Sequence, residues 1–523
     1  MIDIQRLILE LRPDLRKRCG FHLPENADAF LGWLVTTGTL EYAALRDAPA
    51  LLGDLQVRGF GPDKKLTKLQ SLVWNARPDV RKVFSLPRQT VEYLGWFYTH
   101  GLEEHGYWRY LAPAERGMVL RLSEPWRSRI QATVAKVAGV SEPRVPFAAR
   151  AFGVNLIGYA FGELGIGEDA RMAARALLAA KVPVTMLDFP PGADIPQNDR
   201  SMQAHVSASG PYAFNIFCMT ALENGRYFAE RGSAQFAGRY NIGYWPWELG
   251  RWPRQWEAMV ELVDEVWVSS RHTYDALAPL CAKRLHVMPM AVELGEVRAF
   301  RSRKAARQHF RLPEKARLFC FSFDLNSSVH RKNPQACIDA FLKAFPKKEL
   351  DGDKVGLVIK AHRPARRNAG WETLKRLAAK DARIHIIEAT LSRPDLLALY
   401  QACDCYLSLH RAEGFGRGIA EALQLGLHVI TTDYSGNADF CRPPHADLVR
   451  YRLIKVKKGQ YPYGEGQVWA DADVGHATEL MRNFVVRRAK NPARAAWPEF
   501  SAATVGRRYR RRLKEICRER TGR

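Results

Sequence analysis

Short apolar runs alternate with longer amphipathic stretches over most of the chain after residue 150. Runs such as 152–160 and 317–323 have the length and residue types of buried strands. Stretches such as 169–180 and 395–402 repeat their apolar residues with the period of a helix. Further strands are expected at 182–189, 214–219, 241–244, 266–269, 286–290, 356–360, 384–388 and 403–409, and further helices at 255–263, 371–379 and 502–518. Because strands and helices alternate, the pattern predicts α/β architecture with a parallel, doubly wound sheet.

The first 148 residues follow a different pattern, which repeats once. RPDLRK at 12–17 returns as RPDVRK at 77–82, and FLGWLV at 30–35 returns as YLGWFY at 93–98. We interpret this region as two copies of a helical unit of about 65 residues. Its aromatic residues are expected to form a core, and the region as a whole is a candidate for binding an acceptor or a protein partner. Prolines within 141–147 predict a linker to the rest of the chain.

The stretch 403–439 contains the clearest candidate chemistry. An apolar run ends in a loop with Glu413, Gly414 and Gly416, and a helical pattern follows. Such a loop aims free N–H groups and the positive end of the helix at one point, which suits a phosphate or sugar oxygens. Glu413 and Glu421 lie eight positions apart, and each carboxylate could hold a vicinal diol. For an isolated pair of glutamates the alternative is a solvated helix face.

The sequence HRAEGFGRGIAEALQLGLHVITTDYSGNADF at 410–440 resembles the E-x7-E segment of the family 4 retaining glycosyltransferases. The resemblance extends over roughly residues 150–520 and implies the GT-B fold, with two Rossmann-like domains facing a cleft. It places an acceptor-side domain at 149–293 and a domain that binds the nucleotide sugar at 294–490. The basic helix within 491–523 would brace the first of these domains. The N-terminal helical region, 1–148, is not part of the resemblance.

The resemblance also implies roles for individual residues in moving a hexose from a nucleotide diphosphate sugar to a hydroxyl acceptor. Glu413 would hold the sugar hydroxyls and Glu421 the ribose, while Arg331 and Lys332 would stabilise the diphosphate. The remaining residues implied at the donor site are His410, Gly414, Phe415, Gly416, Gly165 and Gly167. In the family the leaving phosphate is thought to accept the proton of the acceptor on the same face, so no protein base is required. A glycan or a lipid-linked glycan is the expected acceptor, in polysaccharide or envelope glycan synthesis.

Two positions depart from the family pattern. Ser322 stands where the resemblance implies an arginine that contacts the diphosphate, so Arg331 is the candidate replacement. On the acceptor side, many members have a histidine in the cleft near the segment YWPWEL at 244–249. Trp245 or Glu248 is the candidate to take its place, with buried packing as the alternative for the tryptophan.

Two other classes of function stay open. Gly165-x-Gly167-x-x-Ala170 matches a dinucleotide-binding fingerprint, and Asp188 closes the next predicted strand where a ribose-binding acid is expected. This pattern favours an NAD(P)-dependent oxidoreductase, although the acids Glu168 and Asp169 lie where a pyrophosphate would approach. The other alternative is a non-catalytic protein that binds sugar nucleotides and is recruited through residues 1–148.

Composition narrows the setting. The chain has 523 residues, 47% of them hydrophobic, which is enough for about three domains. The nine cysteines show no metal-binding spacing. Asp471-Ala472-Asp473 resembles a metal-binding D-x-D, but we assign it to a loop and a helix start, and we predict no metal and no cofactor beyond the nucleotide sugar.

Net charge bears on partners and location. A net charge of +24 favours anionic partners, and without zinc-finger, RNA-binding or recognition-helix motifs nucleic acid is the least favoured of them. The chain has no run of eighteen apolar residues and no signal-peptide pattern at its start. We therefore expect a cytoplasmic protein without a membrane span. The basic amphipathic stretch 502–518 leaves open a peripheral contact with the anionic inner face of a membrane.

Overall fold

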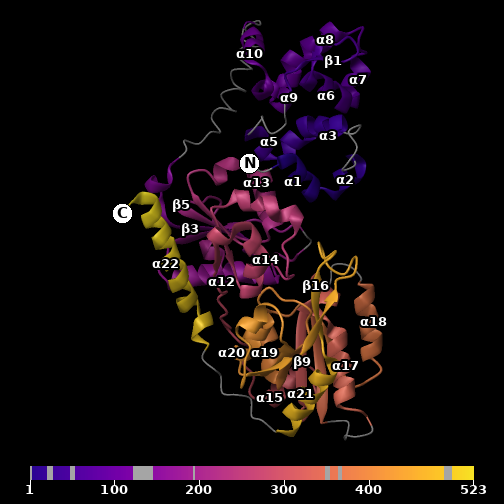
Figure 1. The fold of residues 1–523 in the computed structure, drawn as a ribbon, viewed down its shortest axis with the longest axis vertical. Coiled ribbons are helices and arrows are strands. Elements are labelled where there is room, and N and C mark those ends of the chain that lie inside the picture. The colour runs from indigo at the N-terminus through magenta and orange to yellow at the C-terminus, as the bar shows by residue number, and fades with distance from the viewer. Residues whose placement is uncertain are drawn as a thin grey trace. The chain divides into compact units, whose positions relative to one another are not determined.

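The computed structural model describes residues 3–19, 27–47, 54–119, 121, 145–192, 195–347, 354–362, 368–487 and 497–522. The chain forms two compact units (Figure 1). The first unit joins Met1–Arg150 with two later segments, Ala221–Asn241 and Ala258–Asp264, and the second holds the remaining residues. Of the predicted linker 141–147, residues 141–144 lie outside the described part, and a 3₁₀ turn covers Phe147–Ala149.

The first unit is mainly helical. A short antiparallel pair of strands, β1 (Arg58–Phe60) and β2 (Leu66–Thr67), separates two groups of helices. The first group is α1 (Ile4–Leu11), α2 (Pro13–Cys19), α3 (Ala27–Trp33), α4 (Thr39–Glu41) and α5 (Ala43–Asp47). The second is α6 (Lys68–Ala76), α7 (Pro78–Val83), α8 (Thr90–Trp96), α9 (Leu102–His105) and α10 (Pro113–Val119). Helix α13 (Ala221–Arg231) packs against α1 and α5 and completes the unit.

The two sequence copies in this unit make matching contacts. Each tryptophan helix continues through a π-helical turn, Leu34–Gly38 or Phe97–Gly101, into a short α-helix. In the first copy the Arg12 guanidinium contacts Asp14 (2.9 Å), Glu41 (2.5 Å) and the ring of Trp33 (5.2 Å to its centroid). In the second copy the Arg77 guanidinium contacts Asp79 (2.6 Å), Glu104 (3.0 Å) and the ring of Trp96 (5.9 Å). The arginine of each RPD motif therefore joins its own helix to the aromatic helix that follows.

The second unit contains two six-stranded sheets. The first sheet has the order β4-β3-β5-β6-β7-β8, with β3 parallel to β4 and β5, and β7 parallel to β6 and β8. Its strands are β3 (Ala151–Gly158), β4 (Val184–Asp188), β5 (Tyr212–Cys218), β6 (Tyr240–Tyr244), β7 (Glu265–Val268) and β8 (Leu285–Val287). Helices α12 (Gly165–Ala179) and α14 (Arg271–Cys281) follow β3 and β7. The strands are almost wholly buried, as expected of a parallel sheet covered on both faces.

The second sheet is parallel throughout and has the order β11-β10-β9-β12-β13-β14. Its strands are β9 (Arg317–Asp324), β10 (Val355–His362), β11 (Ile384–Glu388), β12 (Cys405–Ser408), β13 (His428–Thr432) and β14 (Ala446–Val449). The chain moves outward from β9 in one direction and then restarts beside β9 with β12. The loops after β9 and β12 therefore diverge at the carboxyl edge and leave a crevice, which is where ligands bind in such sheets.

Helices and one hairpin complete this half. The helices are α15 (Arg303–His309), α16 (Val329–Lys332), α17 (Pro334–Ala344), α18 (Ala369–Ala378), α19 (Arg393–Ala402), α20 (Arg417–Gln424) and α21 (Val474–Val486). An antiparallel hairpin of β15 (Tyr451–Lys455) and β16 (Val468–Ala472) follows β14. The predicted fold class, two Rossmann-like α/β domains with an added helical region, is confirmed.

Several local predictions need correction. The segment expected to be an α-helix at 255–263 is a 3₁₀ helix, Arg254–Leu262. Asp471 lies in β16 rather than in a loop, and it pairs with Arg411 at 3.3 Å. Asp473 does begin a helix, since its side chain accepts a hydrogen bond from the backbone N–H of His476 at the start of α21. In the described part of the chain, no three His, Cys, Asp or Glu side chains are placed to hold a metal ion.

The C-terminal helix α22 (Ala502–Thr521) packs along α12 of the first sheet's half (Figure 1). Tyr509 lies against Trp267, with ring centroids 5.0 Å apart, and the Arg512 guanidinium contacts Glu265 at 2.9 Å. Gly506 faces the backbone of Ala176 so closely that a side chain at this position would overlap the carbonyl oxygen.

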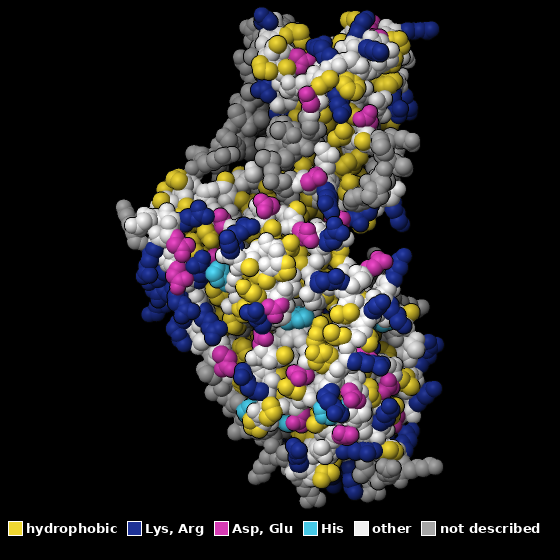
Figure 2. Space-filling view, in the orientation of Figure 1, with side chains coloured by type: hydrophobic (Ala, Val, Ile, Leu, Met, Phe, Trp, Pro, Cys, Tyr) yellow, Lys and Arg dark blue, Asp and Glu magenta, His cyan; other side chains and the backbone are white. Residues whose placement is uncertain are grey.

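The other side of α22 is exposed and strongly basic. Its exposed basic residues include Arg507, Arg510, Arg511, Lys514 and Arg518. Figure 2 shows dark blue side chains gathered on the left of the molecule, where α22 lies in Figure 1. Part of the excess positive charge of the chain is therefore concentrated on one surface. Within the described residues, every helix is too short or too polar to cross a bilayer.

The close approach of α22 and α12 gives a first prediction. Gly506→Ala is expected to lower the free energy of unfolding by about 2 kcal/mol, because the new methyl group must push the two helices apart. Gly370→Ala is the matched control, since its Cβ would meet the nearest atom at an ordinary 3.4 Å. Chemical denaturation of the two variants provides the measurement. Equal stability of both would contradict the tight packing of α22.

Candidate functional site

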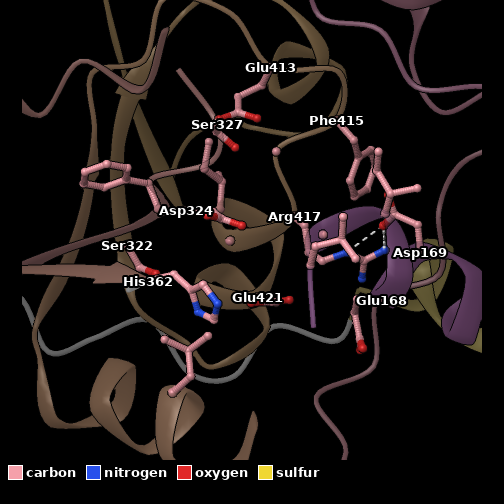
Figure 3. A pocket seen from close by; sticks show the side chains of 18 of the residues that line it. Glu168, Asp169, Ser322, Asp324, Ser327, His362, Glu413, Phe415, Arg417 and Glu421 are labelled. Atoms are coloured by element: carbon pink, nitrogen blue, oxygen red, sulfur yellow. Dashed lines mark hydrogen bonds and ion pairs between the residues drawn. The ribbon is translucent and has the colours of Figure 1, made fainter. Parts of the chain in front are cut away.

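A cavity of about 690 Å³ opens at the carboxyl edges of the two sheets of the second unit (Figure 3). From the first sheet's half it is lined by the start of α12 and by Pro246 and Glu248 after β6. From the second half it is lined by the ends of β9 and β10, the segment Thr390–Arg393 before α19, and the loop that opens α20. The cavity thus receives backbone and side chains from both Rossmann-like halves.

The loop between β12 and α20 has its shape because two of its residues are glycines. Gly416 adopts a positive φ of 95°, which glycine reaches without strain, and α20 begins at the next residue. Gly414 lies against the backbone of Trp247, where a Cβ would meet the carbonyl oxygen at 2.8 Å. The carbonyl of Gly414 accepts a hydrogen bond from Ser270 at 2.5 Å. The loop is therefore fixed on both sides, with the start of α20 facing the cavity.

Glu413 lies between two cations at the base of this loop. Its carboxylate contacts Arg331 at 3.2 Å and is hydrogen-bonded to Lys332. Burial opposes ionisation of Glu413, but the charges of Lys332 and Arg331 outweigh it and lower its pKa to about 2. The side chain is therefore an anion over the whole range in which proteins are folded.

Arg331 and Lys332 reach Glu413 because of the turn that carries them. Ser328 caps α16, and Asn333 ends it in the left-handed conformation with its amide bonded to the carbonyl of Leu409 at 2.9 Å. Burial lowers the pKa of Lys332, and Glu413 opposes the shift. Arg331 also approaches Glu248 at 3.7 Å, so two cations are shared between two carboxylates. Both cations line the cavity, where they are available to an anionic ligand.

Glu421 lies on α20 and is almost fully buried. It accepts a hydrogen bond from Arg393 at 2.7 Å, and Arg393 also approaches Glu168 of α12 at 3.8 Å. Nη2 of Arg393 is buried without a hydrogen-bond partner. Glu421, which is expected to hold a ribose, is thus paired with Arg393, and one N–H group of Arg393 has no acceptor among the described residues.

Another ion pair joins α20 directly to α12. Arg417, the first residue of α20, contacts Asp169 in the first turn of α12, with Glu168 and Glu421 nearby (Figure 3). Burial raises the pKa of Asp169, and Arg417 opposes the shift. The pair connects the two halves of the second unit across the cavity.

This buried pair gives a second prediction. Asp169→Asn is expected to lower the free energy of unfolding by about 3 kcal/mol, because it leaves the largely buried Arg417 guanidinium without its hydrogen-bonded carboxylate. The control is Asp275→Asn, which breaks an exposed pair with Arg271 and is expected to cost less than about 1 kcal/mol. Urea denaturation at neutral pH compares the two. A loss no larger for Asp169 than for Asp275 would show that the pair adds nothing across the cavity.

The other residues predicted at the site fall into two groups. The cavity is lined by Arg331, Lys332, Glu413, Gly414, Phe415, Gly416, Glu421, Gly165 and Glu248. Trp245, His410 and Gly167 are not among the residues that line it.

Each of these three has a packing role instead. Trp245 is fully buried and stacks with Trp252 at 6.0 Å, so Glu248 is the residue of the pair that faces the cavity. His410 is fully buried and hydrogen-bonded to Ser408 (3.1 Å) and Asn437 (3.0 Å), so the direct donor contact expected of it is replaced by support of the loops. Gly167 allows the start of α12 to touch the backbone of Gly162.

Glu248 is held by a residue that sequence reasoning missed. The hydroxyl of Tyr461, from the loop of the β15–β16 hairpin, donates to Glu248 at 2.6 Å. The Tyr461 ring lies 5.8 Å from the Arg331 guanidinium, which in turn approaches Glu248 at 3.7 Å. The aromatic and glycine-rich sequence YPYGEG at 461–466 was the available signal. Arg393 and Arg417 were also missed, since their partners lie far away in sequence.

The dinucleotide fingerprint has a structural use. Asp188 accepts a hydrogen bond from the backbone N–H of Ala160 at 2.9 Å and so fixes the loop after β3. Asp188 does not line the cavity. Glu168 pairs with Arg171 at 3.0 Å in the first turn of α12. The acid expected to bind a ribose in an NAD(P) enzyme is therefore engaged elsewhere.

Comparison with known proteins agrees with this arrangement in the second sheet's half. Residues 303–447 match the family model for glycosyl transferases group 1, and this segment contains Arg331, Lys332, Glu413 and Glu421. No curated protein matches the chain.

Solved structures with a similar outline share little sequence. HepE of Anabaena in complex with UDP and glucose is 14% identical, with a TM-score of 0.49, over 70% of this chain and 100% of its own. Sucrose-phosphate synthase of Thermosynechococcus elongatus is 16% identical, with a TM-score of 0.46, over 70% and 94%. WaaG, a glycosyltransferase involved in lipopolysaccharide biosynthesis, is 15% identical, with a TM-score of 0.40, over 71% and 100%.

Proposed function

We propose that this protein is a retaining glycosyltransferase that moves a hexose from a nucleotide diphosphate sugar to a hydroxyl acceptor. The observation that carries the proposal is the group formed by Glu413, Arg331 and Lys332 at the loop that opens α20. It combines two cations with a carboxylate, and it lies in the segment that matches the glycosyl transferase family model. Such a site can take a diphosphate and a sugar side by side.

The two cations and the carboxylate exchange partners when the donor binds. Arg331 and Lys332 turn from Glu413 to the diphosphate oxygens, with Arg forking onto two oxygens and Lys acting as a point charge. Glu413 then accepts hydrogen bonds from the sugar hydroxyls. As the bond between the anomeric carbon and the phosphate oxygen breaks, negative charge grows on the leaving diphosphate. The cations stabilise that charge more strongly than they stabilise the bound donor, which lowers the barrier.

Glu421 provides for the ribose at the other end of the donor. It accepts from the ribose hydroxyls while the hydrogen bond from Arg393 keeps it oriented. Retention follows when the acceptor oxygen bonds to the anomeric carbon on the face that the diphosphate leaves, and the leaving phosphate takes the acceptor proton. Glu248, held by Tyr461, borders this space from the other half and is the candidate to orient the acceptor hydroxyl. We place the acceptor among glycans or lipid-linked glycans.

The test is the release of nucleoside diphosphate from a panel of nucleotide sugars, followed by NMR of the glycoside formed. We expect turnover with at least one donor, and a product whose anomeric configuration equals that of the donor. Inversion would overturn the retaining assignment but leave the transferase. Saturable donor binding without turnover on any acceptor would favour the non-catalytic binder. NAD(P) binding without affinity for any sugar nucleotide would favour the oxidoreductase.

A further inference from the structure

Lys360 is a buried cation in the wall of the same cavity. Only 5% of its surface is exposed, and it lies near the carboxyl end of β10 among the residues that line the cavity. Among the described residues, none makes a hydrogen bond or ion pair with its ammonium group. Burial lowers the pKa of Lys360 to about 8, although Asp324 opposes the shift. A mostly charged ammonium group that borders the cavity and has no partner among the described residues is available to a ligand that supplies an acceptor.

The register of the sheet places this ammonium group beside the proposed path of the donor. Lys360 is paired with Ser322 of β9, and His362 with Asp324. Paired residues of neighbouring parallel strands point to the same face, so these four side chains share one wall. Figure 3 shows Ser322, Asp324 and His362 together on it. Ser322 is short and uncharged, and Asp324 is acidic. Of these four side chains, the lysine is therefore the one that can offer an ammonium group to the cavity.

The order of the strands indicates which part of the donor lies there. Under the proposed function the sugar binds at Glu413, after β12, and the ribose binds at Glu421, whose carboxylate is bonded to Arg393 just after β11. Because the order is β11-β10-β9-β12, a donor that joins these two places must cross the carboxyl ends of β9 and β10. The middle of a nucleotide sugar is its diphosphate, with the ribose next to it.

The charges also favour a diphosphate here. Each phosphate of a nucleotide sugar carries one negative charge, whereas the charges of Arg331 and Lys332 are already balanced by Glu413 and Glu248. Asp324 adds a negative charge nearby, and it is itself hydrogen-bonded to the backbone N–H of Asn326 at 2.8 Å. A further cation on this wall is therefore needed to match the ligand.

We propose that Lys360 binds the diphosphate of the donor from the β10 side, opposite Arg331 and Lys332. This inference rests on the proposed function and adds a residue to it. The ammonium group donates to an oxygen of the phosphate nearer the nucleoside. Arg331 and Lys332 hold the other phosphate, which is bonded to the sugar until the glycosidic bond breaks. The diphosphate is then clamped between the loop after β9 and the strand β10.

The test compares Lys360→Met with the wild type in equilibrium binding. UDP, GDP and ADP are first titrated into the wild type to find the one that binds most tightly. That nucleoside diphosphate and the nucleoside with the same base are then titrated into both proteins. We expect Lys360→Met to weaken the diphosphate about 10- to 100-fold, the size of one charge-assisted hydrogen bond, and to leave the nucleoside unchanged. Lys360→Arg is expected to recover part of the loss.

The stability of the ligand-free protein is a second readout. Methionine fills the same space without a charge, so Lys360→Met is expected to unfold at the same temperature as the wild type or a higher one. A lower unfolding temperature would show that the lysine has a structural role. An equal loss of affinity for the nucleoside and the nucleoside diphosphate would show that Lys360 contacts the base or the ribose. Either result overturns the inference.

The failure of this inference can be told apart from that of the proposed function. If the wild type binds no nucleoside diphosphate, the proposed function fails. If the wild type binds one and Lys332→Met weakens it while Lys360→Met does not, only the role of Lys360 is wrong.

Discussion

Lys332→Met is expected to lower kcat/KM for the nucleotide sugar about a thousandfold, the loss seen when one preorganised group that stabilises developing charge is removed. Lys332 is half-buried beside Glu413 and lines the cavity, so its ammonium group is held where the diphosphate would bind. The variant keeps the volume of the side chain, so the fold should persist. Binding of nucleoside diphosphate should weaken as well, because the cation contacts the phosphate before and during the reaction.

The control is Lys304→Met, which removes an exposed cation paired with Glu314 at 3.0 Å. It should leave both kcat/KM and diphosphate affinity within about twofold of the wild type, as expected for an exposed pair. If the two variants behave alike, Lys332 does not contact the donor.

Glu413→Gln is expected to separate binding from turnover. In the free protein Glu413 occupies the two cations, so removing its charge frees them. Affinity for nucleoside diphosphate should therefore rise, by about tenfold for the loss of one nearby anion. Turnover should fall at least about a hundredfold, because the amide of glutamine has one oxygen that accepts hydrogen bonds from sugar hydroxyls, whereas the carboxylate has two. Isothermal titration and the release assay measure the two effects on the same preparation.

The opposite changes in nucleoside diphosphate affinity and in turnover distinguish this prediction from a general loss of function. A variant damaged in its fold would lose affinity and turnover together. Glu314→Gln, at an exposed position, should change neither. Weaker diphosphate binding by a well-folded Glu413→Gln protein would contradict the exchange of partners on which the mechanism depends.

The fold was predictable because strands of a parallel sheet that is covered on both faces are continuous apolar runs in the sequence. Strands such as β9 and β11 are short apolar runs, and the observed bounds of β11, Ile384–Glu388, equal the predicted ones. Elements with weaker patterns were missed. The hairpin of β15 and β16 is one of them, and β15 is largely exposed. The helix expected at 255–263 was located, but its apolar spacing did not show that it is a 3₁₀ helix, Arg254–Leu262.

The site was predictable only where one segment holds the chemistry. Glu413 and Glu421 belong to one loop and helix, so their arrangement follows from local spacing. The contact between Glu413 and Lys332 joins residues 81 positions apart. It exists because β12 pairs with β9, which brings the loops after these strands together. The chain itself could not show that pairing; the resemblance supplied it.

Two of the side chains predicted at the site are buried and do not line the cavity. His410 and Trp245 stand next to functional segments, but the backbone turns their side chains inward, where hydrogen bonds or ring packing hold them. Tyr461 lies more than two hundred residues from Glu248, and only the folded hairpin brings the two together. Chemistry that depends on long-range packing has no local pattern to reveal it.

A structure of the protein with a non-hydrolysable nucleotide sugar tests the central claim most directly. We expect the diphosphate oxygens within about 3 Å of Lys332 and Arg331, with Glu413 turned to the sugar hydroxyls and Glu421 to the ribose. A donor bound elsewhere, with the contacts of Glu413 to both cations unchanged, would contradict the account.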